Sequence, residues 1–169
     1  VIARLREEGL LEPRALYAVP EEDLQELIRS SGYFRQKARR LRSLLELCIA
    51  RYDGSLATMF DQPAEALREE LLALNGIGPE TADSILLYGF SKPCFVVDAY
   101  TRRIFSRLGV LRGDEPYEEV RGLFEGGLAP DPGVYGEYHA LIVEHAKRHC
   151  TKRPRCDGCP LGALCAGRP

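Results

Sequence analysis

The sequence has no tryptophan, a single methionine and no apolar run that approaches the ~18 residues of a membrane-spanning helix. No secretory signal is visible at its start. We therefore expect no membrane partner, and no indole ring is available to stack on a ligand. Neither sign of charge dominates, since the net charge is −2 and the pI is about 6.0. This balance argues mildly against nucleic acid as a partner, but the clustering of charge matters more than its total.

What is present fits an ordinary soluble protein. The chain has 169 residues, of which 45% are hydrophobic and 28% are charged. This length suits one domain or two small ones. The chain begins at Val1 and its methionine is Met59, so we expect the natural start to lie upstream.

Apolar residues recur at spacings of three and four along most of the chain, which is typical of amphipathic helices. This spacing, with proline, aspartate and glycine at the ends of segments, predicts helices over residues 2–9, 14–19, 20–32, 34–54, 63–74, 79–90, 98–109, 116–128 and 134–150. The apolar stretch at 93–97 is too short to require a strand, and no alternation of period two is sustained. The sequence therefore predicts an all-α fold.

Cations gather in two places along the chain. One basic stretch contains Arg35, Lys37, Arg39, Arg40 and Arg42, and the other contains Lys147, Arg148, Lys152, Arg153 and Arg155. Each could be a solvated helix face, or it could contact the phosphates of a nucleic acid. Arg35, Lys37, Lys152 and Arg153 are the candidate phosphate contacts.

Four of the six cysteines are crowded at the end of the chain, with the spacing C-x5-C-x2-C-x5-C. The central C-x2-C can turn two thiolates onto one centre, and the flanking cysteines can complete fourfold sulfur coordination by Cys150, Cys156, Cys159 and Cys165. Such a set suits tetrahedral zinc or an iron–sulfur cluster. Disulfides are the alternative, but nothing indicates an oxidising compartment. Cys48 and Cys94 lie in apolar segments and are expected to be packed thiols.

The stretch "LNGIGPETA" interrupts two helical patterns with a turn that contains Gly76 and Gly78. Glycine allows a tight turn and close approach of another molecule, and Pro79 is well suited to the first turn of the next helix. Backbone N–H groups at that helix start could bind a phosphate. An ordinary helical hairpin turn is the alternative. The candidate contacts here are Asn75, Gly76, Ile77, Gly78, Glu80 and Thr81.

The motifs "LNGIGPETADSILLYGF" and "VVDAYTRRIFSRLG", followed by the four-cysteine tail, resemble the endonuclease III superfamily of helix-hairpin-helix DNA glycosylases. The resemblance covers nearly the whole chain. It implies a bilobal helical fold whose amino-terminal part is missing here: residues 1–92 form a six-helix-barrel lobe with the helix-hairpin-helix at about 64–90, and residues 93–169 form an iron–sulfur lobe. It also implies a 4Fe–4S cluster on the loop 150–165, with zinc the less favoured alternative. The first cysteine gap is five residues, where many members have six.

Asp98 stands where a helix-capping residue is expected, just before "AYTRRIF". The cap should lower the pKa of its carboxyl and keep it ionised. An anion in a dry cleft can stabilise positive charge on a sugar, or orient the attacking water. The resemblance places the catalytic aspartate of the family at Asp98.

The resemblance also bears on whether such an enzyme cuts the DNA backbone. Bifunctional members use a lysine after the hairpin glycines, because an amine can form a Schiff base with the sugar. Here Glu80 stands at that position, and no lysine occurs between Lys37 and Lys92. We therefore expect a monofunctional glycosylase. The sequence resembles most closely the group that includes a 3-methyladenine DNA glycosylase with glutamate at this point.

These patterns predict a base-excision repair enzyme that flips a damaged base out of double-stranded DNA and hydrolyses its N-glycosidic bond, with alkylated purines favoured. The alternatives are a bifunctional glycosylase and lyase for oxidised pyrimidines, and a non-catalytic, metal-stabilised DNA-binding module. We expect a monomer in the cytoplasm of a prokaryote, associated with the nucleoid. His139, His145 and His149 could be metal ligands, but packing or surface roles are favoured.

Overall fold

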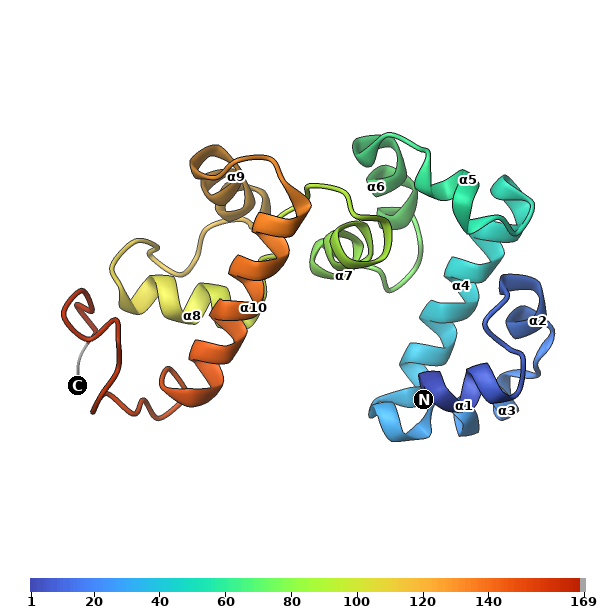
Figure 1. The fold of residues 1–169 in the computed structure, drawn as a ribbon, viewed down its shortest axis with the longest axis horizontal. Helices are drawn as coiled ribbons and strands as arrows, with labels where there is room; N and C mark the ends of the chain where they lie inside the picture. The colour runs from blue at the N-terminus through green and yellow to red at the C-terminus, as the bar shows by residue number, and fades with distance from the viewer. Residues whose placement is uncertain (168–169) are drawn as a thin grey trace. The chain divides into compact units, whose positions relative to one another are not determined.

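The computed structural model describes residues 1–167, and within that range every regular element is a helix (Figure 1). The α-helices are α1 (Ile2–Glu7), α2 (Pro13–Ala18), α3 (Glu21–Leu27), α4 (Phe34–Tyr52), α5 (Leu56–Phe60), α6 (Ala64–Leu72), α7 (Pro79–Ser84), α8 (Ala99–Arg107), α9 (Tyr117–Gly127) and α10 (Pro132–Arg148). A 3₁₀ turn, η1 (Arg29–Ser31), and a π-helical segment, η2 (Ile85–Gly89), complete the set. The predicted all-α class is confirmed.

The chain divides into two compact units, the first of which is Val1–Gly78. Its long helix α4 packs against α2 and α3. Together with α1 and the end of α3, these helices enclose a core of Leu5, Leu16, Leu24, Leu27, Ile28, Ala38 and Leu45. Burial of these leucine side chains is the main stabilising term for such short helices, which would be marginal in isolation.

The second unit runs from Pro79 to the end of the described chain, and α10 packs along α8 within it. Its core is aromatic. The Phe95 and Phe124 rings stack with their centroids 4.3 Å apart, and the Phe105 ring meets Phe124 edge-on at 4.7 Å. Residues 94–97 of the apolar stretch are buried here without forming a strand, while Pro93 is exposed. Phe95, Val96 and Val97 are each less than 3% exposed, so the chain leading to Asp98 is anchored by packing.

Three local features differ from the sequence prediction. Helix α5 was not expected, because its five residues are too few for a helical period to show; Ser55 caps it by accepting a bond from the Thr58 N–H at 3.1 Å. The predicted helix 79–90 changes from α to π geometry at Ile85. Helix α10 begins at Pro132, behind an Asp131 cap, two residues before the predicted start.

The expected packing of the two remaining cysteines is confirmed. Cys48 and Cys94 are buried, with 0% and 2% of their surfaces exposed. No helix within residues 1–167 is long and apolar enough to cross a membrane. The division of the molecule into lobes at residue 92 stays a prediction.

Candidate functional site

Asp98 caps α8, as its sequence position predicts. Its backbone is extended (φ −99°, ψ 179°), and its Oδ1 accepts bonds from the Thr101 N–H at 2.7 Å and the Thr101 hydroxyl at 2.9 Å. Burial alone would raise the pKa of this carboxyl, but the His139 imidazole beside it and the bonds from the Thr101 backbone and hydroxyl outweigh it and hold the pKa below its ordinary value. Asp98 is therefore ionised at neutral pH, with its side chain only 13% exposed.

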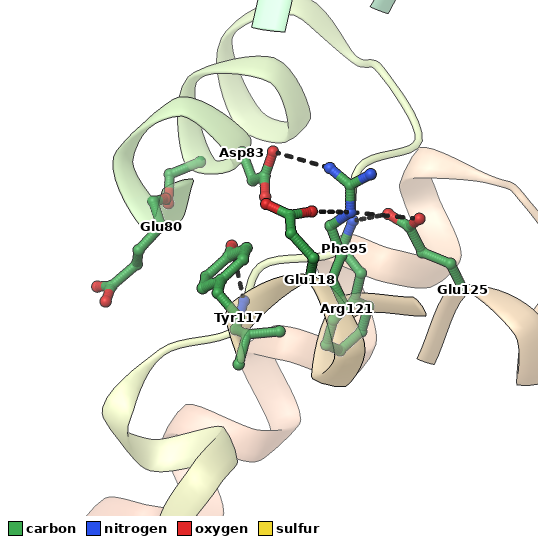
Figure 2. A network of polar contacts seen from close by, with 9 residues as sticks. Glu80, Asp83, Phe95, Tyr117, Glu118, Arg121 and Glu125 are labelled. Atoms are coloured by element: carbon green, nitrogen blue, oxygen red, sulfur yellow. Dashed lines mark hydrogen bonds and ion pairs between the residues drawn. The ribbon is translucent and has the colours of Figure 1, made fainter. Parts of the chain in front are cut away.

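The segment just before Asp98 is held by side chains of α9. The Phe95 N–H donates to Oε1 of Glu125 at 2.9 Å, and the Val97 N–H donates to the Tyr117 hydroxyl at 3.3 Å (Figure 2). These bonds satisfy backbone donors that no sheet satisfies here. They fix the direction in which the chain enters α8, and so the place of Asp98.

A charged network joins α7 to α9 (Figure 2). An Nη1 atom of Arg121 lies 3.7 Å from Oδ1 of Asp83, a carboxylate with no exposed surface. The Arg121 Nε lies 3.5 Å from a carboxylate oxygen of Glu118 and 3.5 Å from one of Glu125. Since Glu125 also holds Phe95, this network connects α7 with the segment that leads to Asp98.

Glu80 lies in the first turn of α7, and its side chain points away from Arg121 in Figure 2. The residue is exposed, but partial desolvation of its carboxyl, and then the charge on Asp98, raise its pKa; His139 opposes this in part. Two carboxyls whose surroundings move their pKa values in opposite directions are a common feature of hydrolytic sites. Thr81, the next residue, is half-buried.

The structure adds two residues that the sequence analysis did not assign to the site. His139, on α10, is partly buried, with 12% of its side chain exposed, and its Nε2 lies 3.5 Å from Oδ2 of Asp98. Its Nδ1 lies 2.6 Å from the hydroxyl of Tyr88. The favoured packing or surface role for His139 is therefore incomplete. Its spacing with His145 and His149 carried no signal of this contact, because the partner is 41 positions away in sequence.

In the first unit, the hairpin residues Asn75 and Gly76 line a surface pocket of about 280 Å³ with side chains of α4. Gly76 has φ +84°, and a Cβ there would come 3.3 Å from Nε of Arg40. Gly78 has open space on its Cβ side. Glycine at 76 is thus favoured by the positive φ of the backbone, whereas glycine at 78 leaves room for another molecule.

Some cations of the basic stretch on α4 bind backbone carbonyls of the protein, and others lie at the surface or line the hairpin pocket. Nη1 of Arg42 donates to the Val19 carbonyl at 2.8 Å, so Arg42 ties α4 to the loop before α3. Lys37 donates to the Ser31 carbonyl at 2.6 Å, while Arg35 is exposed. Arg39 and Arg40 line the hairpin pocket together with Gln36 and Ser43.

Ile77, in the hairpin turn, is buried. Its N–H is used within the turn, where it donates to the Leu74 carbonyl at 3.1 Å.

The four terminal cysteines, Cys150, Cys156, Cys159 and Cys165, are free thiols that line one cavity. Nη1 of Arg107 lies 3.2 Å from Sγ of Cys150 and donates to the Thr151 carbonyl at 2.8 Å, and its Nη2 donates to the Lys152 carbonyl at 3.2 Å. Across residues 1–167, no three His, Cys, Asp or Glu side chains lie close enough to hold a single metal ion. Lys152 and Arg153 are exposed on this loop.

The capped aspartate, the hairpin glycines and the cysteine loop agree with a comparison against protein families. A model described as "HhH-GPD superfamily base excision DNA repair protein" matches residues 1–130. The chain belongs to the HhH-GPD superfamily. It is an endonuclease III-like member, and thus a DNA glycosylase, an enzyme acting on N-glycosyl bonds.

Curated relatives and solved structures agree with this assignment. The chain is 46% identical to a protein of Methanocaldococcus jannaschii assigned as a DNA repair glycosylase, covering 99% of this chain and 76% of that protein. It is 34% identical to endonuclease III of Thermotoga maritima, covering 90% of this chain and 67% of that one.

Two solved structures are similar in fold. A non-covalent endonuclease III–DNA complex has a TM-score of 0.78 and 30% identity, covering 98% of this HhH-GPD chain and 73% of that one. The 3-methyladenine DNA glycosylase of H. pylori, bound to 1,N6-ethenoadenine, has a TM-score of 0.73 and 27% identity, covering 87% and 75% of the two chains.

Proposed function

We propose that this base-excision repair glycosylase is monofunctional: it flips a damaged base out of double-stranded DNA and hydrolyses the N-glycosidic bond without forming a Schiff base. The observation that carries the proposal is the pair of carboxyls, an ionised Asp98 electrostatically coupled to Glu80. An anion near the sugar stabilises the positive charge that develops as the bond breaks. Glu80 stands where a bifunctional enzyme would place its amine, and a carboxylate cannot attack as an amine does.

We further propose an alkylated purine, such as 3-methyladenine, as the substrate. A cationic base is already a good leaving group and needs little acid catalysis. A negative Glu80 would also attract it, and the exposed ring of Tyr88 offers an aromatic face. The fold shared with a 3-methyladenine DNA glycosylase bound to a modified adenine supports this choice.

A bifunctional enzyme for oxidised pyrimidines is the second candidate. It is favoured by the relatives named endonuclease III, and by the likeness to a trapped covalent endonuclease III–DNA intermediate at a TM-score of 0.78. A non-catalytic DNA-binding module is the third. The ionised, buried carboxylate of Asp98 argues against it, since a plain helix cap needs neither burial nor a facing imidazole.

DNA contacts are proposed for the hairpin and for the two basic regions. Helix-start N–H groups and glycines that permit close approach suit a phosphate. The proposed contacts are Asn75, Gly76, Ile77, Gly78, Glu80, Thr81, Arg35, Lys37, Lys152 and Arg153. Of these, the Ile77 N–H is already used inside the turn, so its part would be to shape the loop. We propose that the enzyme acts as a monomer, with lobes 1–92 and 93–169, in the nucleoid region of a prokaryotic cytoplasm.

We propose that the cysteine loop holds a 4Fe–4S cluster, with zinc the less favoured alternative. Four sulfurs around one zinc would lie about 3.8 Å apart, as a Zn–S length of about 2.3 Å and tetrahedral angles require. The thiols here share one cavity, but no three of them converge on a single-ion site. A 4Fe–4S cluster would be held by four cysteine thiolates. Cys150, Cys156, Cys159 and Cys165 would hold it, and Arg107 beside Cys150 suits an anionic thiolate. The cluster would supply a rigid fold to the loop.

Borohydride trapping on abasic DNA tests the monofunctional reaction. We expect no covalent adduct with the wild type or with Glu80→Gln, and an adduct with Glu80→Lys, which places an amine beside Asp98. A wild-type adduct would establish the bifunctional alternative. Release of free base from duplexes carrying a panel of lesions tests the substrate, with Asp98→Asn as the inactive control. If Asp98→Asn processed DNA like the wild type, the catalytic assignment would fail.

A further inference from the structure

His139 is the one side chain of α10 that bridges two polar groups beside the proposed reaction centre. Its ring is 12% exposed and lies between Tyr88, from η2, and Asp98, at the start of α8. The Tyr88 and His139 ring centroids are 5.9 Å apart, at an interplanar angle of 48°. The Tyr88 ring also packs beside Gly136, one turn earlier on α10, where a Cβ would make an ordinary van der Waals contact with Cε1 at 3.7 Å.

The contacts with Asp98 and Tyr88 together determine where the imidazole proton lies. Burial, and then the charge on Asp98, raise the pKa of the Tyr88 phenol, so the hydroxyl keeps its proton at neutral pH. Oδ2 of the ionised Asp98, 3.5 Å from Nε2, can only accept, so a neutral imidazole carries its proton on Nε2. Nδ1 is then the acceptor, and the Tyr88 hydroxyl 2.6 Å away donates to it. Tyr88 therefore supports the tautomer that turns an N–H toward Asp98.

The Nε2–H donor of His139 faces one acceptor, Oδ2 of Asp98. The Nε2 atom is buried, makes no hydrogen bond of good geometry within the described residues, and lies 3.5 Å from Oδ2 of Asp98. Buried donors are rarely left unsatisfied. Bonds of this kind in ligand-free sites are often long and shorten when the substrate is bound. The second oxygen of Asp98, Oδ1, is already used by Thr101.

We propose that His139, oriented by Tyr88, is the positioning residue of Asp98: it presents Nε2–H to Oδ2 and holds the carboxylate ionised and correctly directed toward the sugar. This inference rests on the proposed function of Asp98. The groups that face the imidazole are Asp98 from the segment before α8, Tyr88 from η2 and the carboxyl of Glu80 from α7. Removing the imidazole would leave two carboxyls near each other and Oδ2 of Asp98 without a facing donor, with Thr101 still donating to Oδ1.

The kinetic test uses three variants of the full protein and the pH profile of base release. His139→Phe removes the donor, and we expect kcat to fall roughly tenfold or more with KM little changed, and the acid limb of the profile to move to higher pH. His139→Gln, whose amide can still donate to Oδ2, should restore most of kcat. Tyr88→Phe should lower kcat in the wild-type background but not in the His139→Gln background, because Tyr88 acts through the imidazole.

A matched control removes a tyrosine hydroxyl elsewhere. Tyr100→Phe, at a ring that packs under Arg103, should leave kcat and the pH profile unchanged. A merely structural role of His139 would lower the unfolding free energy without moving the acid limb. If His139→Phe keeps the wild-type acid limb and kcat, the proposal is wrong.

A measurement without substrate separates this proposal from the proposed function. Nitrogen-15 chemical shifts of the His139 ring should show the proton on Nε2 in the wild type and a mixture of tautomers in Tyr88→Phe. A wild-type ring protonated on Nδ1 would overturn the proposal even in an active enzyme. Should no lesion be processed by the wild type, the proposed function fails, while the tautomer result still decides the arrangement of Tyr88, His139 and Asp98.

Discussion

Asp98 and Arg107 stand at the two ends of α8. Asp98 accepts bonds from the first turn of the helix, and Arg107, the last residue of the helix, reaches Cys150 and the carbonyls that follow it. One helix of nine residues, about 13 Å long at ~1.5 Å per residue, thus joins the proposed catalytic carboxylate to the cysteine loop.

Arg107→Met tests whether Arg107 holds the cysteine loop against the end of α8. It removes three donated bonds, to Sγ of Cys150 and to the Thr151 and Lys152 carbonyls, and leaves their acceptors unsatisfied. We expect a loss of about 1–3 kcal/mol of unfolding free energy, with faster bleaching of the visible iron–sulfur absorbance. Denaturant unfolding and absorbance decay measure the two effects.

Arg148→Met is the matched control for Arg107→Met. Arg148 pairs with Glu144 on the exposed face of α10, and its side chain is 72% exposed. Surface pairs of this kind contribute about 0–1 kcal/mol. Equal losses for the two variants would show that Arg107 does not hold the loop.

Local patterns predict much of this fold, and long-range contacts account for what they miss. The Asp98 cap could be predicted because the capping residue and Thr101 are three residues apart. The bridging position of His139 could not, since it depends on how α10 packs across α8 and η2. The same holds for Arg39 and Arg40, which look like the rest of a basic stretch until the hairpin brings Asn75 and Gly76 beside them.

Substitutions of Asp98 should separate its capping role from its catalytic one. Asparagine is as good a cap as aspartate, while alanine loses about 1 kcal/mol at such positions. We therefore expect Asp98→Asn to unfold with a smaller loss of free energy than Asp98→Ala. Both variants should release base at least about 100-fold more slowly, because neither supplies an anion. Rates that follow stability, with asparagine close to the wild type, would show that Asp98 is only a cap.

The ionisation of Asp98 also predicts how stability depends on pH. Its folded pKa lies below the ordinary value of 3.8, so its charge stabilises the folded state above that pH. This contribution is lost as the pH falls through the folded pKa. The free-energy difference between the wild type and Asp98→Asn should thus be constant near neutrality and shrink below pH 3.8. Denaturant titrations at a series of pH values measure it, and a difference that grew toward acid would contradict the lowered pKa.

The buried pair of Asp83 and Arg121 gives the last prediction. Asp83 is fully buried, and its carboxylate lies 3.7 Å from the guanidinium, whose own side chain is 13% exposed (Figure 2). Removing one partner of such a pair leaves an uncompensated charge and costs about 3–5 kcal/mol, whereas replacing both by apolar residues is often close to neutral. We expect Arg121→Met to unfold far more easily than the wild type, and the double variant Asp83→Leu, Arg121→Met to regain most of that loss.

Arg112→Met provides the control for the buried pair. Arg112 is 76% exposed beside Asp114, so its loss should change the unfolding free energy by less than about 1 kcal/mol. Base release adds a second test, because Arg121 also contacts Glu125, which holds the Phe95 N–H ahead of Asp98. The double variant should regain stability yet release base more slowly than the wild type. If it regained both in full, the network would serve stability alone and would not place Asp98.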